Sequence, residues 1–348
     1  MENTNLENVT MNNTNTENLK TNEQLLEEKI FRSSEKIKQV IKEVHKKIVG
    51  QDDLIQSILV WLFAKWHILI EGVPGLAKTL TVDTLSKTLD LGFNRIQFTP
   101  DLLPSDLIWT EIFNQKSGEF LIKKGPIFNN FILADEINRA PSKVQSALLE
   151  AMAEKHITIW NDTFFLDNPF IVLATQNPIE HSGTYRLPEA QLDRFMMKVE
   201  IDYPSKNDEI DMYKKLNNKF DDIIIEKVLH KNDILEIQNI LQEIYVSDNI
   251  FEYVSNLIDS TRNPEKYWLW DLKKYLSYGI SPRWWISLIS WAKVLALMDN
   301  RSYVIPEDIK KISKKVMWHR IALNYEAIAN DIKIDDIVKI IMDWVNVI

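Results

Sequence analysis

The chain has 348 residues, of which 45% are hydrophobic and 26% charged, and its formal net charge is −9 with a pI of about 5.3. This length suits two or three compact domains. Because the chain has no cysteine, disulfides, thiolate metal sites and cysteine nucleophiles are excluded. The acidic balance argues against a broad nucleic-acid-binding face.

Residues 1–33 are rich in Asn, Thr and Glu and hold few large apolar side chains. Such a composition buries too little apolar surface to offset the entropy of ordering, so we expect a disordered polar tail. The N-terminus has neither the apolar core nor the basic flank of a signal or transit peptide. The most apolar stretch, 58–70, is broken by Lys65 and His67 and is too short to span a bilayer. We therefore expect a cytoplasmic protein without a membrane span.

Helical spacing of apolar residues begins at Ser34 and predicts helices near 34–48 and 54–62. Strands alternating with helices follow, and this order predicts a parallel sheet covered on both faces, within an α/β domain over 34–205. A hairpin is expected near 156–166, because two β-prone runs flank Asn161 and Asp162. The region between 98 and 124 is expected to be irregular and polar.

The stretch from Ile68 to Leu80 predicts a strand, a phosphate-binding loop and a helix. Glycines let the backbone fold tightly enough to aim several N–H groups at a triphosphate. Lys78 can reach the β- and γ-phosphates, and the Thr79 hydroxyl is placed to bind Mg²⁺. The usual pattern G-x-x-x-x-G-K-[ST] fails at Ala77, so a strand-to-helix turn with a chance lysine is the alternative. The predicted loop comprises Gly72, Val73, Pro74, Gly75, Leu76, Ala77, Lys78 and Thr79.

Two acids follow the buried strand that begins at Phe131, and they are expected at the ligand edge of the sheet. Asp135 would hold Mg²⁺ through its water shell, and Glu136 would orient an attacking water. Alternatively, both acids simply begin the next helix, which Pro141 opens. Asn177 follows the strand 170–174 and would reach the γ-phosphate or the water, although an Asn after a strand is often a turn former.

Three arginines are candidates for contact with phosphate, because the guanidinium offers a fixed fork of donors. A short helix is predicted over 187–195, with Arg186 just before it and Arg194 at its end. The alternative role for either arginine is a surface salt bridge. Arg283 follows Ser281 and Pro282 in the first turn of a helix, where the helix dipole favours acids. A bound anion would explain an arginine there.

Past residue 205 the strand patterns end, and residues 206–348 are expected to form an α-helical second domain. A group of tryptophans in this region is expected to pack in the core or at an oligomer contact, rather than to form a ligand cage. These are Trp268, Trp270, Trp284, Trp285 and Trp291. The predicted helices lie near 208–219, 232–246, 248–261, 282–298, 306–321 and 335–346.

Together these motifs resemble the MoxR family of AAA+ ATPases, from about residue 35 to about residue 323. GVPGLAKT resembles the family's Walker A motif, in which alanine before the lysine is usual. Five more segments resemble family signatures: RIQFTPDLLPSD, GPIF, LADEINRAPSKVQSALLEAM, LATQNPIE and LPEAQLDRF. The resemblance implies a P-loop AAA+ core, with a parallel sheet flanked by helices, followed by an all-α lid domain.

The resemblance also implies roles for single residues. Asp135 and Glu136 resemble Walker B, Asn177 resembles sensor 1, and Arg283 resembles sensor 2. Arg194 resembles the arginine finger, which would reach the nucleotide of a neighbouring subunit.

Other segments resemble the family less directly. Ile48–Gln51, with Val49 and Gly50, is similar to the segment that cups the adenine. The hairpin 156–166 resembles the pre-sensor 1 insertion and residues 111–124 the helix-2 insertion, and both would face a pore and engage substrate. Arg186 departs from the family, since it stands where proline is usual, and it is a second candidate for the finger. Trp284 and Trp285 also depart, because smaller residues are usual there.

By resemblance, the chain is expected to hydrolyse ATP with Mg²⁺ in a homo-oligomeric ring, expected to be a hexamer, and to remodel a protein substrate as a chaperone does. A protein with a von Willebrand factor A domain is the expected partner. The alternative is a nucleic-acid-stimulated AAA+ motor, which the acidic composition and the lack of a zinc or helix-turn-helix module disfavour. A scaffold that binds ATP without turnover is a third possibility, against which the set of candidate catalytic residues speaks.

Overall fold

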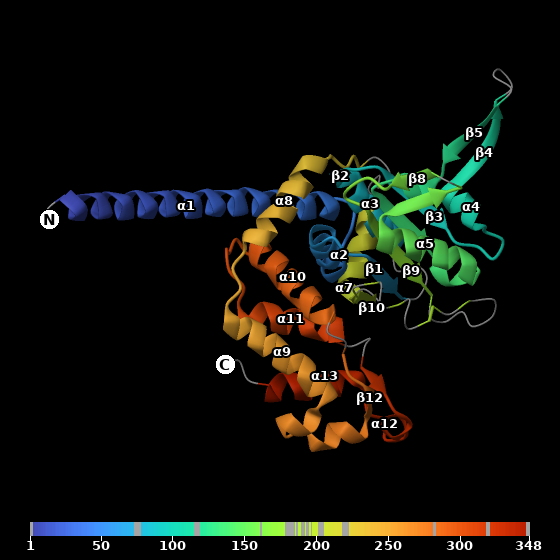
Figure 1. The fold of residues 1–348 in the computed structure, drawn as a ribbon. Coiled ribbons are helices and arrows are strands. Elements are labelled where there is room, and N and C mark those ends of the chain that lie inside the picture. The colour runs from blue at the N-terminus through green and yellow to red at the C-terminus, as the bar shows by residue number, and fades with distance from the viewer. Residues whose placement is uncertain are drawn as a thin grey trace.

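The structure, a computed structural model, describes residues 3–72, 78–114, 119–160, 162–177, 185, 187–188, 192, 195, 197–200, 205–217, 223–280, 283–317 and 321–345. A five-stranded sheet lies between layers of helices, and a helical C-terminal region lies beside it (Figure 1). The predicted class, a parallel sheet flanked by helices and followed by a helical region, is confirmed. No helix in the described part of the chain is both long and apolar enough to cross a bilayer.

The central sheet has the strand order β10-β1-β9-β6-β3, and all neighbouring strands in it run parallel. Because the strands share one direction, their carboxyl ends form a single edge, where a ligand is expected in such a sheet. The strands are β1 (Ile68–Glu71), β3 (Phe93–Gln97), β6 (Phe131–Asp135), β9 (Ile171–Gln176) and β10 (Met197–Glu200).

Side chains alternate between two hydrophobic cores, one on each face of the sheet. In β1, Ile68 and Ile70 join the core formed with α1 (Asn3–His45), α2 (Asp52–Ala64) and α3 (Lys78–Thr88). Leu69 points to the other core, where α5 (Ser142–Glu154) packs. Because β1, β6 and β9 are buried on both faces, these three strands read as the apolar runs that predicted them.

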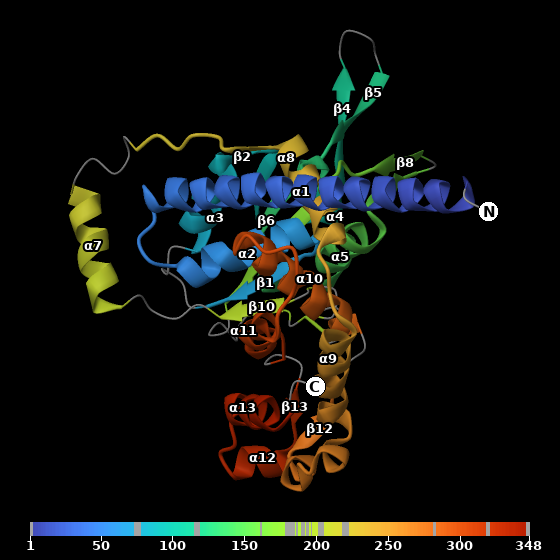
Figure 2. The same ribbon diagram turned by 90° about the vertical axis from the view of Figure 1, so that its left-hand side faces the viewer.

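The first helix differs from the disordered tail expected over 1–33, because α1 runs from Asn3 to His45. Ile30 is 1% exposed and lies seven residues before Ile37, so both side chains are on one face of the helix and join the first core. Ser34 donates a hydrogen bond to the carbonyl oxygen of Met298 at 2.9 Å. The last turns of the expected tail therefore belong to the core, while the N-terminal part of α1 extends away from the body (Figures 1 and 2).

The C-terminal region contains the expected helices. Of these, α8 and α10 pack against α1 and α2, so part of the region joins the core of the α/β unit, and the domain boundary at 205/206 stays a prediction. Trp284 and Trp291 are 2% exposed, as expected for core residues, whereas Trp268 and Trp270 are exposed. The helices are α7 (Lys206–Asn217), α8 (Lys231–Glu243), α9 (Asp248–Arg262), α10 (Arg283–Met298), α11 (Pro306–Met317), α12 (Tyr325–Ala329) and α13 (Ile334–Trp344).

Two short strand pairs involve residues of this region, and one of them connects it to the α/β unit. The strand β11 (Leu229–His230) pairs with β2 (Leu89–Asp90), and β12 (Leu276–Tyr278) pairs with β13 (Ala322–Leu323). Strands of two or three residues leave too little alternation for a period-2 pattern to reveal them.

Two antiparallel hairpins project from the α/β unit. The one between β7 (His156–Ile159) and β8 (Asp162–Phe165) confirms the predicted hairpin. The other, formed by β4 (Trp109–Asn114) and β5 (Glu119–Lys124), follows α4 (Pro104–Ile108) and was expected to be irregular. It stands away from the body in Figure 1. The rings of Trp109 and Trp160, 5.2 Å apart, join the two hairpins.

Candidate active site

The predicted phosphate loop leaves β1 at Glu71, and α3 begins at Lys78, so a strand and a helix flank the loop as expected. Residues 73–77, which include Val73, Pro74, Gly75, Leu76 and Ala77, lie outside the described residues. The Lys78 ammonium donates a hydrogen bond to the carbonyl oxygen of Gly72. Burial lowers the pKa of Lys78, while the carboxylates of Asp135, Glu136 and Glu71 act in the opposite direction. A half-buried cation thus lies among three acids at the N-terminus of α3.

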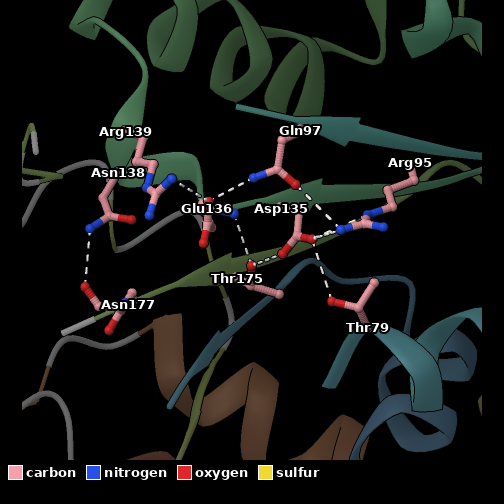
Figure 3. Close-up of polar contacts among 9 residues, drawn as sticks. All are labelled: Thr79, Arg95, Gln97, Asp135, Glu136, Asn138, Arg139, Thr175 and Asn177. Carbon is pink, nitrogen blue, oxygen red and sulfur yellow. Dashed lines mark hydrogen bonds and ion pairs between the residues drawn. The ribbon is translucent and has the colours of Figure 1, made fainter. Parts of the chain in front are cut away.

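Asp135 ends β6 and is 7% exposed. Its two carboxylate oxygens have different partners (Figure 3). Oδ1 accepts a hydrogen bond from the Thr175 hydroxyl at 2.6 Å. Oδ2 lies 3.4 Å from the Thr79 hydroxyl and 2.6 Å from Nη2 of Arg95. The structure therefore brings together Thr79 and Asp135, the two residues predicted to bind a metal ion.

The donor set at this point fits Mg²⁺. A carboxylate and a hydroxyl are hard oxygen ligands, and Mg²⁺ is commonly held by one or two carboxylates together with phosphates and water. Elsewhere in the described ranges there is no group of three or more His, Cys, Asp or Glu side chains that could hold a metal ion. The pair formed by Thr79 and Asp135 supplies two hard oxygen atoms, so it resembles a partial site of the kind that a nucleotide completes.

Glu136 follows directly and has φ at 58°, in the left-handed region. This conformation costs a non-glycine residue about 1–2 kcal/mol, and the Glu136 N–H donates a hydrogen bond to the Thr175 hydroxyl at 2.9 Å, which stabilises it. The carboxylate accepts a hydrogen bond from Gln97 Nε2 at 2.7 Å and lies 3.1 Å from Nη1 of Arg139. The backbone and two side chains thus fix the direction of this acid (Figure 3).

Asn177 comes directly after β9 and is 6% exposed. Its carbonyl oxygen accepts a hydrogen bond from the side chain of Asn138 at 3.2 Å, and Asn138 lies in η2 (Ile137–Arg139), the 3-10 turn after Glu136. Asn177 therefore reaches the same edge of the sheet as the two acids, as the sequence predicted.

Four residues at this edge were not predicted from the sequence: Arg95, Gln97, Arg139 and Thr175. The sequence held one signal for two of them. Arg95 and Gln97 lie on either side of Ile96, which is buried, so both side chains lie on the face of β3 opposite to Ile96. The register places Gln97 beside Asp135, but that neighbour relation depends on which strand lies next to β6.

The remaining predicted residues are located only in part. Gly50 has φ at 63°, in the turn before α2, and a Cβ there would lie 3.2 Å from Cγ of Asp208 on α7, so the position favours glycine. The contact of Val49 and Gly50 with adenine stays a prediction. Arg283 begins α10, but its side chain is outside what the structure describes, and Arg186 and Arg194 are outside it altogether.

Comparison with known proteins supports this reading. Residues 67–197 match the ATPase family associated with various cellular activities (AAA), and residues 272–341 match the AAA lid domain. The chain is 43% identical over 309 residues to Chaperone MoxR1 of Mycobacterium tuberculosis, which covers 89% of this chain and 81% of the relative.

A more distant relative and a solved structure also match this chain. Protein MoxR of Methylorubrum extorquens is 27% identical over 307 residues, with 81% of this chain and 86% of the relative covered. The crystal structure of an ATPase candidate from Cytophaga hutchinsonii matches with a TM-score of 0.88 at 51% identity, and covers 95% of this chain and 99% of that one. With a strand and a helix on either side of the predicted phosphate loop and two acids at the end of β6, these matches show that the chain belongs to the MoxR family of AAA+ ATPases.

Proposed function

We propose that this chain hydrolyses ATP with Mg²⁺ in a homo-oligomeric ring and uses the cycle to remodel a partner protein. The observation that carries the proposal is the meeting of Lys78, Thr79, Asp135 and Glu136 at one edge of the sheet. A cation, a partial metal site and an acid held in a fixed direction are the groups that phosphoryl transfer needs.

Each of these groups has a distinct proposed part. Lys78 and the backbone N–H groups of the loop bind the phosphates at the N-terminus of α3. Thr79 and Asp135 hold Mg²⁺, which when bound neutralises charge on the phosphate oxygens. Glu136 orients the attacking water and receives its proton, and the contacts from Gln97 and Arg139 keep its carboxylate in place. Asn177 binds the γ-phosphate or the water.

The ring follows from the proposed arginines. Arg194, with Arg186 as the second candidate, supplies a finger to the nucleotide of the adjacent subunit, and Arg283 contacts the nucleotide from the lid. A finger that acts between subunits makes an isolated subunit a poor catalyst. A hexamer is the proposed assembly.

A protein client is proposed because the M. tuberculosis relative is named a chaperone. The partner proposed from the family is a protein with a von Willebrand factor A domain. In the test, the Glu136→Gln protein is loaded with ATP and used to capture such a partner from the source cells. Capture of a von Willebrand factor A protein by Glu136→Gln, and its absence with Lys78→Ala, is expected. Equal capture by both variants would contradict a nucleotide-dependent partnership.

The experiment that tests the ring is a dilution series. The rate of phosphate release per subunit is measured with Mg²⁺ while light scattering follows the assembly state. The rate per subunit is expected to fall together with the loss of the ring, and added single-stranded or duplex DNA is expected to leave it unchanged. A constant rate down to isolated monomers would contradict catalysis between subunits, and stimulation by DNA would replace protein remodelling with a nucleic-acid motor.

A further inference from the structure

Arg95 is a cation in contact with the proposed metal-binding acid. It lies on β3, the edge strand next to β6, and its side chain is half exposed. Nη2 of Arg95 lies 2.6 Å from Oδ2 of Asp135, and Nε lies 3.2 Å from the same oxygen (Figure 3). Both N–H groups therefore converge on one carboxylate oxygen, rather than spreading over two.

That oxygen is also the one that faces Thr79. The Asp135 side chain is only 10% exposed, and Oδ1 is occupied by the short hydrogen bond from Thr175. Oδ2 is the oxygen that faces the proposed metal ion, because the Thr79 hydroxyl approaches it at 3.4 Å. A carboxylate oxygen has about two lone pairs, and three donors share those of Oδ2: the Thr79 hydroxyl and the two N–H groups of Arg95. Arg95 and the water shell of a metal ion bound by Thr79 would therefore both bind the same oxygen, Oδ2.

We propose that Arg95 is a positioning residue that competes with Mg²⁺ for Oδ2 of Asp135, and so sets the Mg²⁺ concentration at which the nucleotide site fills. The inference rests on the proposed metal role of Thr79 and Asp135. Two cations at one oxygen repel each other, and the charge of Arg95 therefore weakens the hold on Mg²⁺.

The guanidinium has a second acceptor available. Nη2 of Arg95 lies 3.3 Å from Oε1 of Gln97, two residues further along the same strand. Because the guanidinium is half exposed and has this second acceptor, its release from Asp135 would leave no buried cation unpaired. A divalent cation can therefore displace the Arg95 side chain from Asp135.

A purely structural role for Arg95 predicts the opposite effect. If the pair only tied β3 to β6, its removal would loosen Asp135, and metal binding would weaken. If Arg95 competes with the metal, its removal makes metal binding tighter. The direction of the change separates the two roles, since damage to the site does not strengthen binding.

The test uses Mn²⁺, which binds hard oxygen ligands and is visible by electron paramagnetic resonance. The full-length protein saturated with ADP is titrated with Mn²⁺, and the concentration at half-saturation is compared between wild type and Arg95→Gln. That concentration is expected to fall about five- to tenfold in Arg95→Gln, because one nearby like charge is removed. The matched control is Lys87→Gln, which removes one positive charge from the exposed pair with Asp83 on α3 and is expected to leave it unchanged.

A second variant covers the case in which Arg95→Gln melts well below wild type. Arg95→Lys keeps the charge but offers a single flexible ammonium in place of the two converging N–H groups, and it is expected to lower the half-saturation concentration two- to threefold. A folded Arg95→Gln protein with unchanged or weaker Mn²⁺ binding would overturn the inference while the proposed function stands. Wild-type protein that bound neither ADP nor Mn²⁺ would overturn the proposed function itself, and this inference with it.

Discussion

At the amino end of the central sheet, His67 and Asn130 are buried and bonded mainly to backbone groups. At the carboxyl end, Asp135 and Glu136 are bonded mainly to other side chains. His67 lies between the Met152 carbonyl oxygen, at 3.2 Å, and the Val172 N–H, at 3.1 Å. Both of its ring nitrogens therefore have a partner that belongs to the fold.

Asn130 performs a similar task for three strands. It accepts from the Gly92 N–H at 3.3 Å and donates to the Pro169 carbonyl oxygen at 3.0 Å, so it connects the starts of β3, β6 and β9. Backbone partners do not rotate away, whereas Arg95, Gln97 and Arg139 at the other end have rotatable side chains and are partly exposed. Backbone partners thus hold the strands together at one end of the sheet, whereas partly exposed side chains hold the two acids at the other end. Changes at the amino end should therefore reduce stability, and changes at the carboxyl end should alter nucleotide chemistry.

The largest effect is expected from Lys78→Ala at the carboxyl end. ADP affinity should fall roughly 10²- to 10³-fold, because the half-buried cation proposed to contact the phosphates is lost. Lys87→Ala, at the far end of the same helix, is the control and should bind ADP normally. Isothermal titration measures both, and ADP binding by Lys78→Ala within threefold of wild type would contradict the proposed phosphate site.

Asn130→Ala should have the next largest effect. Loss of the amide leaves the Gly92 N–H and the Pro169 carbonyl without this partner, which should lower the free energy of unfolding by about 3 kcal/mol. The neighbouring Asn129 makes one side-chain hydrogen bond, to the Pro126 carbonyl oxygen at 2.9 Å, and Asn129→Ala should lose about 1 kcal/mol. Urea unfolding checks the pair. Equal losses in both variants would remove the special role given to Asn130.

The free energy of unfolding is expected to depend on pH through His67. Burial lowers the pKa of His67 to about 4, from an ordinary value of 6.5. Between these values the unfolded chain binds the proton and the folded chain does not, so the contribution of His67 to stability is full above pH 6.5 and is lost as the pH falls toward 4. We expect a loss of about 2 kcal/mol between pH 7.5 and pH 5.

Urea unfolding at the two pH values measures this loss, and His67→Phe should show a flatter dependence. If His67→Phe lost as much stability as wild type over this interval, another group would be responsible.

Gln97→Leu should have the smallest effect. It removes one of the two side chains that hold the Glu136 carboxylate, while Arg139 stays in place. We expect kcat to fall about fivefold with KM nearly unchanged, and the free energy of unfolding to change by less than about 1 kcal/mol, because Gln97 is exposed. Gln242→Leu, an exposed position on α8, is the control. A loss of stability without a loss of kcat would show that Gln97 stabilises the fold and does not support turnover.

Much of the carboxyl end could be predicted from the sequence. Buried parallel strands read as continuous apolar runs, and Glu71, Asp135 and Asn177 stand where such runs stop. The lysine after the glycine-rich loop predicted a phosphate site at the same edge. These features are local, since each needs only the residues within one strand and the turn that follows it.

The partners of those acids could not be predicted, because they depend on which strands are neighbours. Nothing near Arg95 in the sequence indicates that β3 lies beside β6. The extent of α1 was missed for a related reason, since Ile30 becomes a core residue only through contacts with segments far along the chain. The hairpin of β4 and β5 was missed because its strands carry many polar residues and little alternation.

At the carboxyl end, Glu136 is proposed to serve turnover and not nucleotide binding. Glu136→Gln keeps the size and the hydrogen-bonding capacity of the side chain but removes the negative charge. Its ATP affinity should stay within threefold of wild type, while phosphate release in a single turnover should slow at least 100-fold. Glu154→Gln, an exposed position on α5, should behave as wild type. Undiminished phosphate release by Glu136→Gln would contradict the account.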